Sequence, residues 1–187
     1  MSALLKQPIS LEDFLAWEAK QPIRYEFDGV RAIAMAGGTD AHSAIQINLA
    51  IAVGGRLRGG PCQFRNNDLK IQVVGHSRYP DGFVVCSRRQ PDVTVVHDPV
   101  VVFEVVSESS WATDYNDKNR EYAATPSIKR YVILHQDQMA GMMFERIGDD
   151  WVGHLLTAAS ILNMPEIDIE VPLAEFYDGV EFPPAEA

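Results

Sequence analysis

The sequence predicts a single α/β domain in which helices flank a mixed β-sheet. At 187 residues, with 47% hydrophobic and 22% charged residues, the chain is long enough for one well-packed core and short for two. Segments of helical periodicity alternate with segments typical of strands, in the order helix, hairpin, helix, three strands, helix, strand, hairpin. We therefore expect one domain over residues 1–187, ordered from about residue 10 to about residue 180.

The N-terminal part is expected to form a helix followed by a hairpin. The stretch SLEDFLAWEAK predicts a helix with Ser10 as its N-cap and Asp13 three positions later, which is close to a capping box. The stretch IRYEFDGVRAIAM predicts a hairpin, because Asp28 and Gly29 suit a tight primed turn between two strand-forming runs.

A second helix is expected over residues 40–59. Its apolar residues recur at helical spacing, so one side of it should face the core. These residues are Ile45, Leu49, Ala52 and Val53.

Two strands are expected to pair next, over residues 63–74 and 79–86, across the loop GHSR. If Val74 faces Tyr79 in this pair, then Asp68, Lys70 and Asp81 lie on one face of the sheet, because side chains alternate along a strand.

The second half of the chain predicts two central strands and a terminal hairpin. The stretches VVVFEVVS and IKRYVILHQ are almost continuously apolar, which is typical of strands covered on both faces. Between them, ATDYNDKNREYAAT predicts a helix that ends before Pro126. The stretches GMMFERI and DWVGHLLTA predict a hairpin across the residues Gly148, Asp149 and Asp150.

Composition limits the possible classes of protein. The net charge of −10 and pI of about 4.9 argue against a protein that holds nucleic acid by bulk electrostatics alone. No apolar run is long enough to span a bilayer, and the N-terminus has no secretory h-region. With only Cys62 and Cys86 present, we expect a cytoplasmic protein without a disulfide.

Two carboxylates stand where strands are expected. Asp81 follows Pro80 at the start of an apolar run, and Glu104 lies inside VVVFEVVS. Burying such groups is costly unless they are paired or bind a cation. Two carboxylates on adjacent strands, with the Val105 carbonyl between them, suit a hard divalent cation such as Mg²⁺. The alternatives are that Asp81 caps a turn and that Glu104 forms a structural ion pair.

The chain resembles the PD-(D/E)XK nuclease superfamily and, more closely, the Uma-type restriction endonucleases. Pro80-Asp81, a gap, and Glu104-Val105-Val106 before a helix match the superfamily pattern. The stretches that match the Uma-type pattern extend over most of the chain: RYEFDG, GGTDAHSAIQINL, LRGGPC, NNDLKI, YPD, DPVVVFEVVS, DYNDKNREY, PSIKRYVIL and LAEFYDGV. The resemblance implies a restriction-endonuclease-like core within the α/β domain.

The resemblance also implies which residues form the site. Asp81 and Glu104 match the two metal-binding carboxylates, and Glu26 matches a further acidic residue beside them. Mg²⁺ would be the cofactor, with Mn²⁺ as a substitute and the Val105 carbonyl as a third ligand.

Two positions depart from the pattern. Val106 stands where the superfamily has a catalytic lysine, so another lysine is expected to replace it. Lys118, on the following helix, shares one helix face with Asp114 and Tyr122 by i, i+4 spacing and is favoured over Lys70. Gly82 stands where the family usually has a β-branched residue.

The expected function is metal-dependent hydrolysis of phosphodiester bonds, with DNA as the substrate. The alternative is a nuclease fold that has lost catalysis and serves as a nucleic-acid-binding or protein-interaction module. A homodimer is plausible, because cutting both strands usually needs two sites. His42 is either an acid or base of the site or a helix-cap or core residue.

Overall fold

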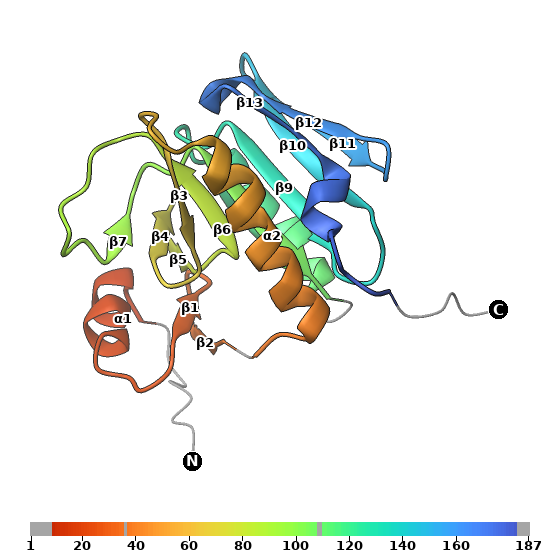
Figure 1. Ribbon diagram of the computed structural model, residues 1–187. Helices are drawn as coiled ribbons and strands as arrows, with labels where there is room; N and C mark the ends of the chain where they lie inside the picture. The colour runs from red at the N-terminus through yellow and green to blue at the C-terminus, as the bar shows by residue number, and fades with distance from the viewer. Residues whose placement is uncertain (1–8, 36, 108–109, 183–187) are drawn as a thin grey trace.

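A computed structural model describes residues 9–35, 37–107 and 110–182 (Figure 1). A six-stranded mixed sheet forms the centre, in the order β11-β10-β9-β8-β6-β3. Strands β8 and β9 run parallel, and the other neighbouring pairs run antiparallel. The strands are β3 (Gln63–Asn66), β6 (Gly82–Val85), β8 (Val101–Val106), β9 (Arg130–His135), β10 (Gly141–Ile147) and β11 (Asp150–Leu156).

Two smaller sheets lie beside the central one. A five-stranded sheet has the order β2-β1-β5-β4-β7, and β12 pairs with β13. Their strands are β1 (Tyr25–Phe27), β2 (Ala32–Ala34), β4 (Lys70–Val73), β5 (His76–Arg78), β7 (Val95–Val96), β12 (Ile161–Met164) and β13 (Ile169–Pro172).

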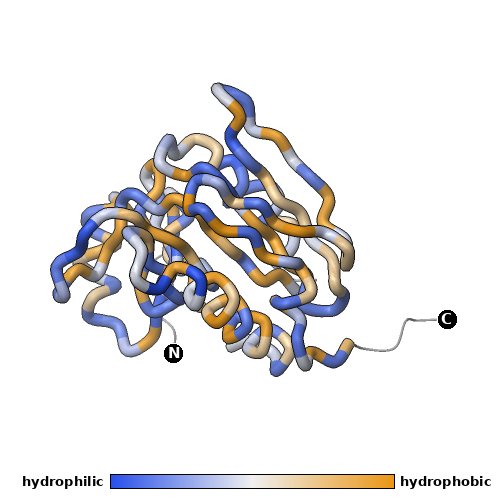
Figure 2. Tube along the Cα trace, turned by 45° about the horizontal axis from the view of Figure 1, so that its top comes forward, coloured by the Kyte–Doolittle hydropathy of each residue, from blue (hydrophilic) through white to orange (hydrophobic). Residues whose placement is uncertain are grey.

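Helices cover both faces of the central sheet. Helix α2 (Asp40–Arg56) crosses one face and packs with the 3₁₀ helix Leu173–Tyr177, as Figure 1 shows. A π-helical turn over Thr113–Lys118, continued by α3 (Asn119–Ala123), packs on the other face. Helix α1 (Leu11–Glu18) packs against β1 with its own small apolar cluster. Hydrophobic segments therefore concentrate in the strands between these layers (Figure 2).

Several expected elements are confirmed. Ser10 caps α1 by accepting a hydrogen bond from the Asp13 N–H, at 3.0 Å. The predicted apolar side of the second helix is the buried side of α2, residue for residue. Strand β8 is buried along its whole length, as its apolar sequence predicts, and the C-terminal hairpin is β10 and β11. Among the described residues, no helix is long and apolar enough to cross a membrane.

The predicted pairing of residues 63–74 with 79–86 is correct for Gln63–Asn66 and Gly82–Val85, but its register and the pairing of the remaining residues are wrong. Val74 and Gly75 both have positive φ and form a two-residue turn, which pairs Val73 with His76. The segment therefore divides: β4 pairs with β5 in the small sheet, while β3 pairs with β6 in the central sheet. A valine at positive φ is rare, so residue type does not predict a turn at this position.

The first hairpin has a longer loop than predicted. Phe27 pairs with Ala32, so four residues and not two connect β1 to β2. The Asp28 carboxylate accepts hydrogen bonds from the N–H groups of Val30 and Arg31, at 3.0 and 2.8 Å, and these bonds stabilise the wider loop.

The expectation that the cysteines are unpaired is also wrong, because Cys62 and Cys86 form a disulfide. The pairing of Gln63 with Val85 in β3 and β6 brings the two cysteines opposite each other, just beyond the strand ends. The prediction rested on the small number of cysteines and on the expected compartment. The disulfide forms because the register of β3 and β6 brings the two cysteines together.

Candidate active site

A cavity of about 1010 Å³ opens between the central six-stranded sheet and the five-stranded sheet. Its lining comes from β1, the start of α2, the start of β6, the end of β8 and the π-helical turn. Among the described residues, the acidic side chains in the lining are Glu26, Asp81, Glu104 and Asp114. The basic side chains are Lys118, His42 and Arg24, the last of which forms an ion pair with Asp68.

Asp81 is held at the start of β6 by hydrogen bonds to both carboxylate oxygens. The Val105 N–H donates to Oδ2 at 2.6 Å, and Gln46 Nε2 donates to Oδ1 at 2.5 Å. His42 Nε2 lies 3.3 Å from Oδ2, and this carboxylate contributes to a raised pKa of His42 although burial acts in the opposite direction. Asp81 thus connects α2 to β8 and does not merely cap a turn.

Gly82, next to Asp81, is explained by its surroundings. A Cβ atom at this position would lie 2.5 Å from the Phe64 ring, closer than real contacts allow. The departure from a β-branched residue therefore makes room for Phe64, which packs against the core beneath α2.

Glu104 is buried in β8 with only 4% of its surface exposed. Its Oε1 accepts hydrogen bonds from Lys118 Nζ, at 2.9 Å, and from the Tyr122 hydroxyl, at 3.1 Å. Burial raises the pKa of the Glu104 carboxyl well above its ordinary value, against the opposing effect of Lys118. The carboxylates of Asp114, Asp81 and Glu26 raise this pKa further, so the site carries more negative charge than its lysine balances.

Lys118, the lysine favoured to replace the one missing at position 106, lies beside Glu104. Besides Glu104, its Nζ lies 2.9 Å from Asp114 Oδ1 and 3.8 Å from Glu26 Oε1. Burial by itself would lower the pKa of Lys118, but Glu104 and the other two carboxylates outweigh it and the pKa rises well above the ordinary value. Lys118 therefore stays charged, while Val106 packs in the apolar cluster beneath it.

Glu26 has protein partners on both oxygens. Oε1 accepts from the Tyr79 N–H at 3.0 Å, and Oε2 lies 3.2 Å from Arg78 Nη1. Arg78 is itself buried, and it also donates two hydrogen bonds to Glu121, at 2.8 and 2.6 Å. The acidic side chains of the cavity form a carboxylate cluster, and Glu26 lies at its edge, attached to the five-stranded sheet and 3.8 Å from Lys118.

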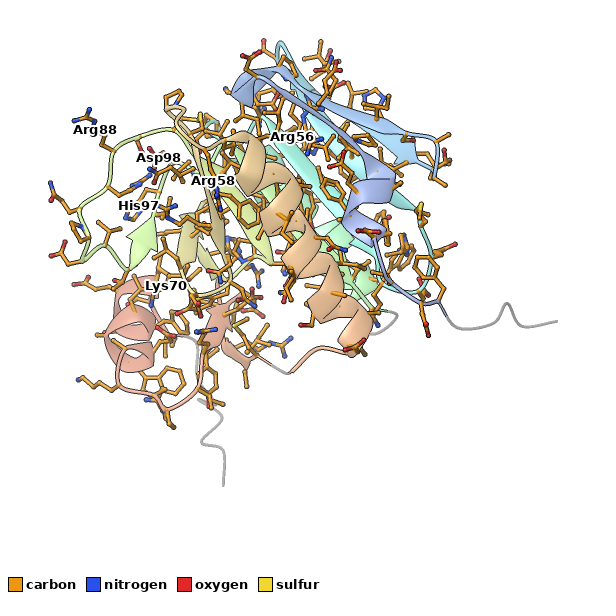
Figure 3. All side chains as sticks on the ribbon, in the orientation of Figure 1. Arg56, Arg58, Lys70, Arg88, His97 and Asp98 are labelled. Atoms are coloured by element: carbon orange, nitrogen blue, oxygen red, sulfur yellow. A yellow bond between two sulfur atoms is a disulfide. The ribbon has the colours of Figure 1, made fainter. Side chains whose placement is uncertain are left out.

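Lys70 does not belong to this cluster. It lies in β4 beside α1 (Figure 3), where its Nζ pairs with Glu18 and lies 5.8 Å from the centre of the Tyr79 ring. The Val74-Gly75 turn is the cause, because it places β4 in the small sheet and not beside β6. Of the two candidate lysines, only Lys118 reaches the carboxylates.

The fit of the site to a divalent cation depends on which acidic side chains converge. No three Asp, Glu, His or Cys side chains converge as a metal-binding group within residues 9–35, 37–107 and 110–182. A ligand set that includes Glu26 is therefore not assembled. Asp81 and Glu104 remain, and two carboxylates with waters suffice for Mg²⁺. Burial chiefly, and then the neighbouring carboxylates of Asp114, Asp81 and Glu26, raise the Glu104 pKa. A hard cation bound by Asp81 and Glu104 would offset this negative charge, so the residues fit such an ion.

Three residues of the site were noted in the sequence without a firm role, and one was missed. His42, Asp114 and Tyr122 all contact the carboxylate cluster. Gln46 was missed, although its position four residues after His42 places both on one side of α2.

Comparison with known proteins gives consistent results. The family model Uma2, described as "Putative restriction endonuclease", matches residues 11–167. The "Uncharacterized protein slr1290" of Synechocystis sp. is 32% identical over 178 residues, which cover 93% of this chain and 94% of that protein.

One solved structure shows the same fold. It is the crystal structure of "a putative nuclease belonging to DUF820" from Anabaena variabilis, with a TM-score of 0.73 and 13% sequence identity. The match covers 91% of this chain and 98% of that chain. The predicted restriction-endonuclease-like fold is therefore confirmed.

Proposed function

Because the chain belongs to the Uma2 family, we propose that it hydrolyses phosphodiester bonds in DNA with the aid of Mg²⁺ or Mn²⁺ bound at the cavity. One observation carries the proposal: Asp81, directly before β6, and Glu104, in the neighbouring strand β8, line the same cavity, and Lys118 lies 2.9 Å from Glu104. Two carboxylates and one lysine around a cavity favour a role in phosphoryl transfer over a purely structural ion pair.

Each protein group has a role in this reaction. Asp81 and Glu104 would hold the cation, which when bound supplies charge stabilisation and a more acidic water. Lys118, charged and held between Glu104 and Asp114, stabilises the negative charge that develops on the phosphate oxygens. Gln46 and the Val105 N–H fix the orientation of Asp81, so that no reorganisation is needed when the substrate binds.

A second function is supported by a specific observation. Both oxygens of Asp81 and one oxygen of Glu104 already accept hydrogen bonds from protein donors. A nuclease fold whose carboxylates only stabilise the structure would serve as a nucleic-acid-binding or protein-interaction module. Affinity for a divalent cation distinguishes the two functions, because a ligand that binds only the folded state raises stability by mass action.

The first experiment is a thermal unfolding series with Mg²⁺ and Mn²⁺, comparing wild type with Glu104→Ala. We expect the metal to raise the Tm of wild type only. The control is Glu170→Ala, which removes an exposed carboxylate of β13 and should keep the wild-type response.

Cleavage is then measured on supercoiled plasmid, linear duplex and single-stranded DNA. We expect Asp81→Ala and Glu104→Ala to abolish metal-dependent cleavage, and Lys118→Met to reduce the rate by roughly 10²–10³-fold. Full activity in either carboxylate variant would refute the site. A metal-dependent Tm without cleavage of any DNA would favour the binding module.

A further inference from the structure

The outward side of α2 carries exposed side chains in a symmetrical pattern. Asp40, Ile47, Ile51 and Arg58 are exposed, and seven, four and seven residues separate them. At about 100° per residue these spacings place all four along one line of the helix, opposite its buried side. Leu57, in αR conformation, continues the helical path beyond Arg56, and Arg58 lies beside the C-terminal end of α2 (Figure 3).

The middle of this line is apolar and uncovered. Ile47 and Ile51 are 57% and 67% exposed, one turn apart. Small residues flank them, namely Ala44, Ala50 and Gly54. In Figure 1 the outer side of α2 faces the viewer with no other element across it. Single exposed aliphatic residues are ordinary, but an adjacent pair with small neighbours on an open helix is typical of a contact surface.

Gly55 leaves open space beside this surface of α2. It lies inside α2, where glycine is less favourable than alanine. A Cβ atom at this position would meet nothing within 4 Å, so packing inside the chain does not require glycine here. Close approach of another backbone from outside would account for it.

We propose that α2 packs antiparallel against α2 of a second copy of the chain, about a two-fold axis at the level of Leu49. The spacings of seven, four and seven residues are the same when read in either direction along the helix, as an antiparallel contact between two identical surfaces requires. Ile47 then faces Ile51 of the second copy, and Asp40 faces Arg58 of the second copy, so that both the apolar and the charged positions are complementary.

The contact is expected to be reversible. One helix pair buries less than the ~800 Å² per partner of a standard interface, so the dimer should form and dissociate with concentration. His42 and Gln46 contact Asp81 from a different side of α2. The interface therefore does not depend on the proposed nuclease activity, and it uses no residue assigned to that activity.

Sedimentation velocity of the full chain over a concentration series tests the proposal. Wild type should change from monomer to dimer as concentration rises. Ile51→Lys should raise the dissociation constant at least about tenfold, since the lost apolar contact occurs twice in the dimer. Ile161→Lys is the matched control, because Ile161 is 62% exposed on β12 and should leave the equilibrium unchanged.

A charge exchange tests the register. Asp40→Arg and Arg58→Asp should each weaken the dimer, and the double variant should restore it, because each new arginine would face a new aspartate. Circular dichroism and thermal unfolding verify that every variant folds. A chain that stays monomeric at every concentration overturns the proposal. So does a dimer that Ile51→Lys leaves intact, or a double variant no stronger than the single variants.

Discussion

Replacing Lys118 with methionine should destabilise the metal-free protein strongly and with an unusual dependence on pH. The substitution keeps most of the side-chain volume but removes the cation that lies 2.9 Å from both Glu104 and Asp114. Both carboxylates are buried, at 4% and 3% exposure, so water cannot take over the lost interaction.

The expected magnitude follows from this burial. Removing one partner of a buried ion pair typically costs about 3–5 kcal/mol, because the other charge is left uncompensated. With a urea m-value of about 2 kcal/mol/M, the unfolding midpoint should fall by roughly 2 M. Lys129→Met is the control, since Lys129 is exposed and its Nζ donates only to the Pro126 carbonyl.

The pH dependence gives a second, independent readout. The pKa of Glu104 is already raised in the folded state, chiefly by burial, and loss of Lys118 raises it further. A group with a raised folded-state pKa stabilises the fold at pH values below its unfolded pKa, and this contribution is lost as the pH rises. The deficit of Lys118→Met should therefore shrink as the pH falls from neutral toward the ordinary glutamate pKa.

The assay is urea unfolding followed by tryptophan fluorescence, with a chelator present, at several pH values. A midpoint shift no larger than that of Lys129→Met would refute the view that Lys118 neutralises the buried carboxylates. A deficit that grows on acidification would contradict the sign derived for Glu104.

Three further outcomes are expected. Gly82→Ala should destabilise the fold by about 1–3 kcal/mol in urea unfolding, with partial recovery when Phe64 is replaced by leucine, because the new Cβ would overlap the Phe64 ring. Reduction of the bond between Cys62 and Cys86, which closes a loop over a sequence separation of 24, should lower stability by about 3 kcal/mol; two free thiols in the purified, unreduced protein would contradict it. Arg78→Met should cost about 3–5 kcal/mol, since it removes the buried arginine that pairs with the buried Glu121 and the half-buried Glu26; a loss under 1 kcal/mol in the same assay would show that the network is dispensable.

The parts of the fold with strong periodicity could be predicted from the sequence. The buried side of α2 and the buried strand β8 were predicted correctly, because each follows from spacing within a single segment. Asp81, Glu104 and Lys118 were also expected together, and the structure places all three around one cavity. Their spacing matched a known pattern, which supplied the long-range arrangement that periodicity alone does not contain.

The parts that failed depend on contacts between distant segments. The position of Lys70 is determined by the positive φ of Val74, which residue type argues against. The disulfide depends on the register of β3 and β6, which the number of cysteines does not reveal. The partnership of Gln46 with Asp81 likewise appears only when α2 is docked on the sheet.

The π-helical turn over Thr113–Lys118 accommodates one more residue than a regular α-helical turn would. A π turn contains one more residue than the α-helical turn it replaces, and it is commonly found at functional sites. Deleting one residue between Asp114 and Lys118 would let the segment relax to a regular α-helix, which is locally more favourable. The two flanks would keep nearly the same orientation relative to each other, because a π turn takes up its extra residue without changing the phase of the helix on either side. Lys118 and Tyr122 could then still bond Glu104, so the extra residue determines the shape of the turn itself, where Asp114 lies beside Lys118.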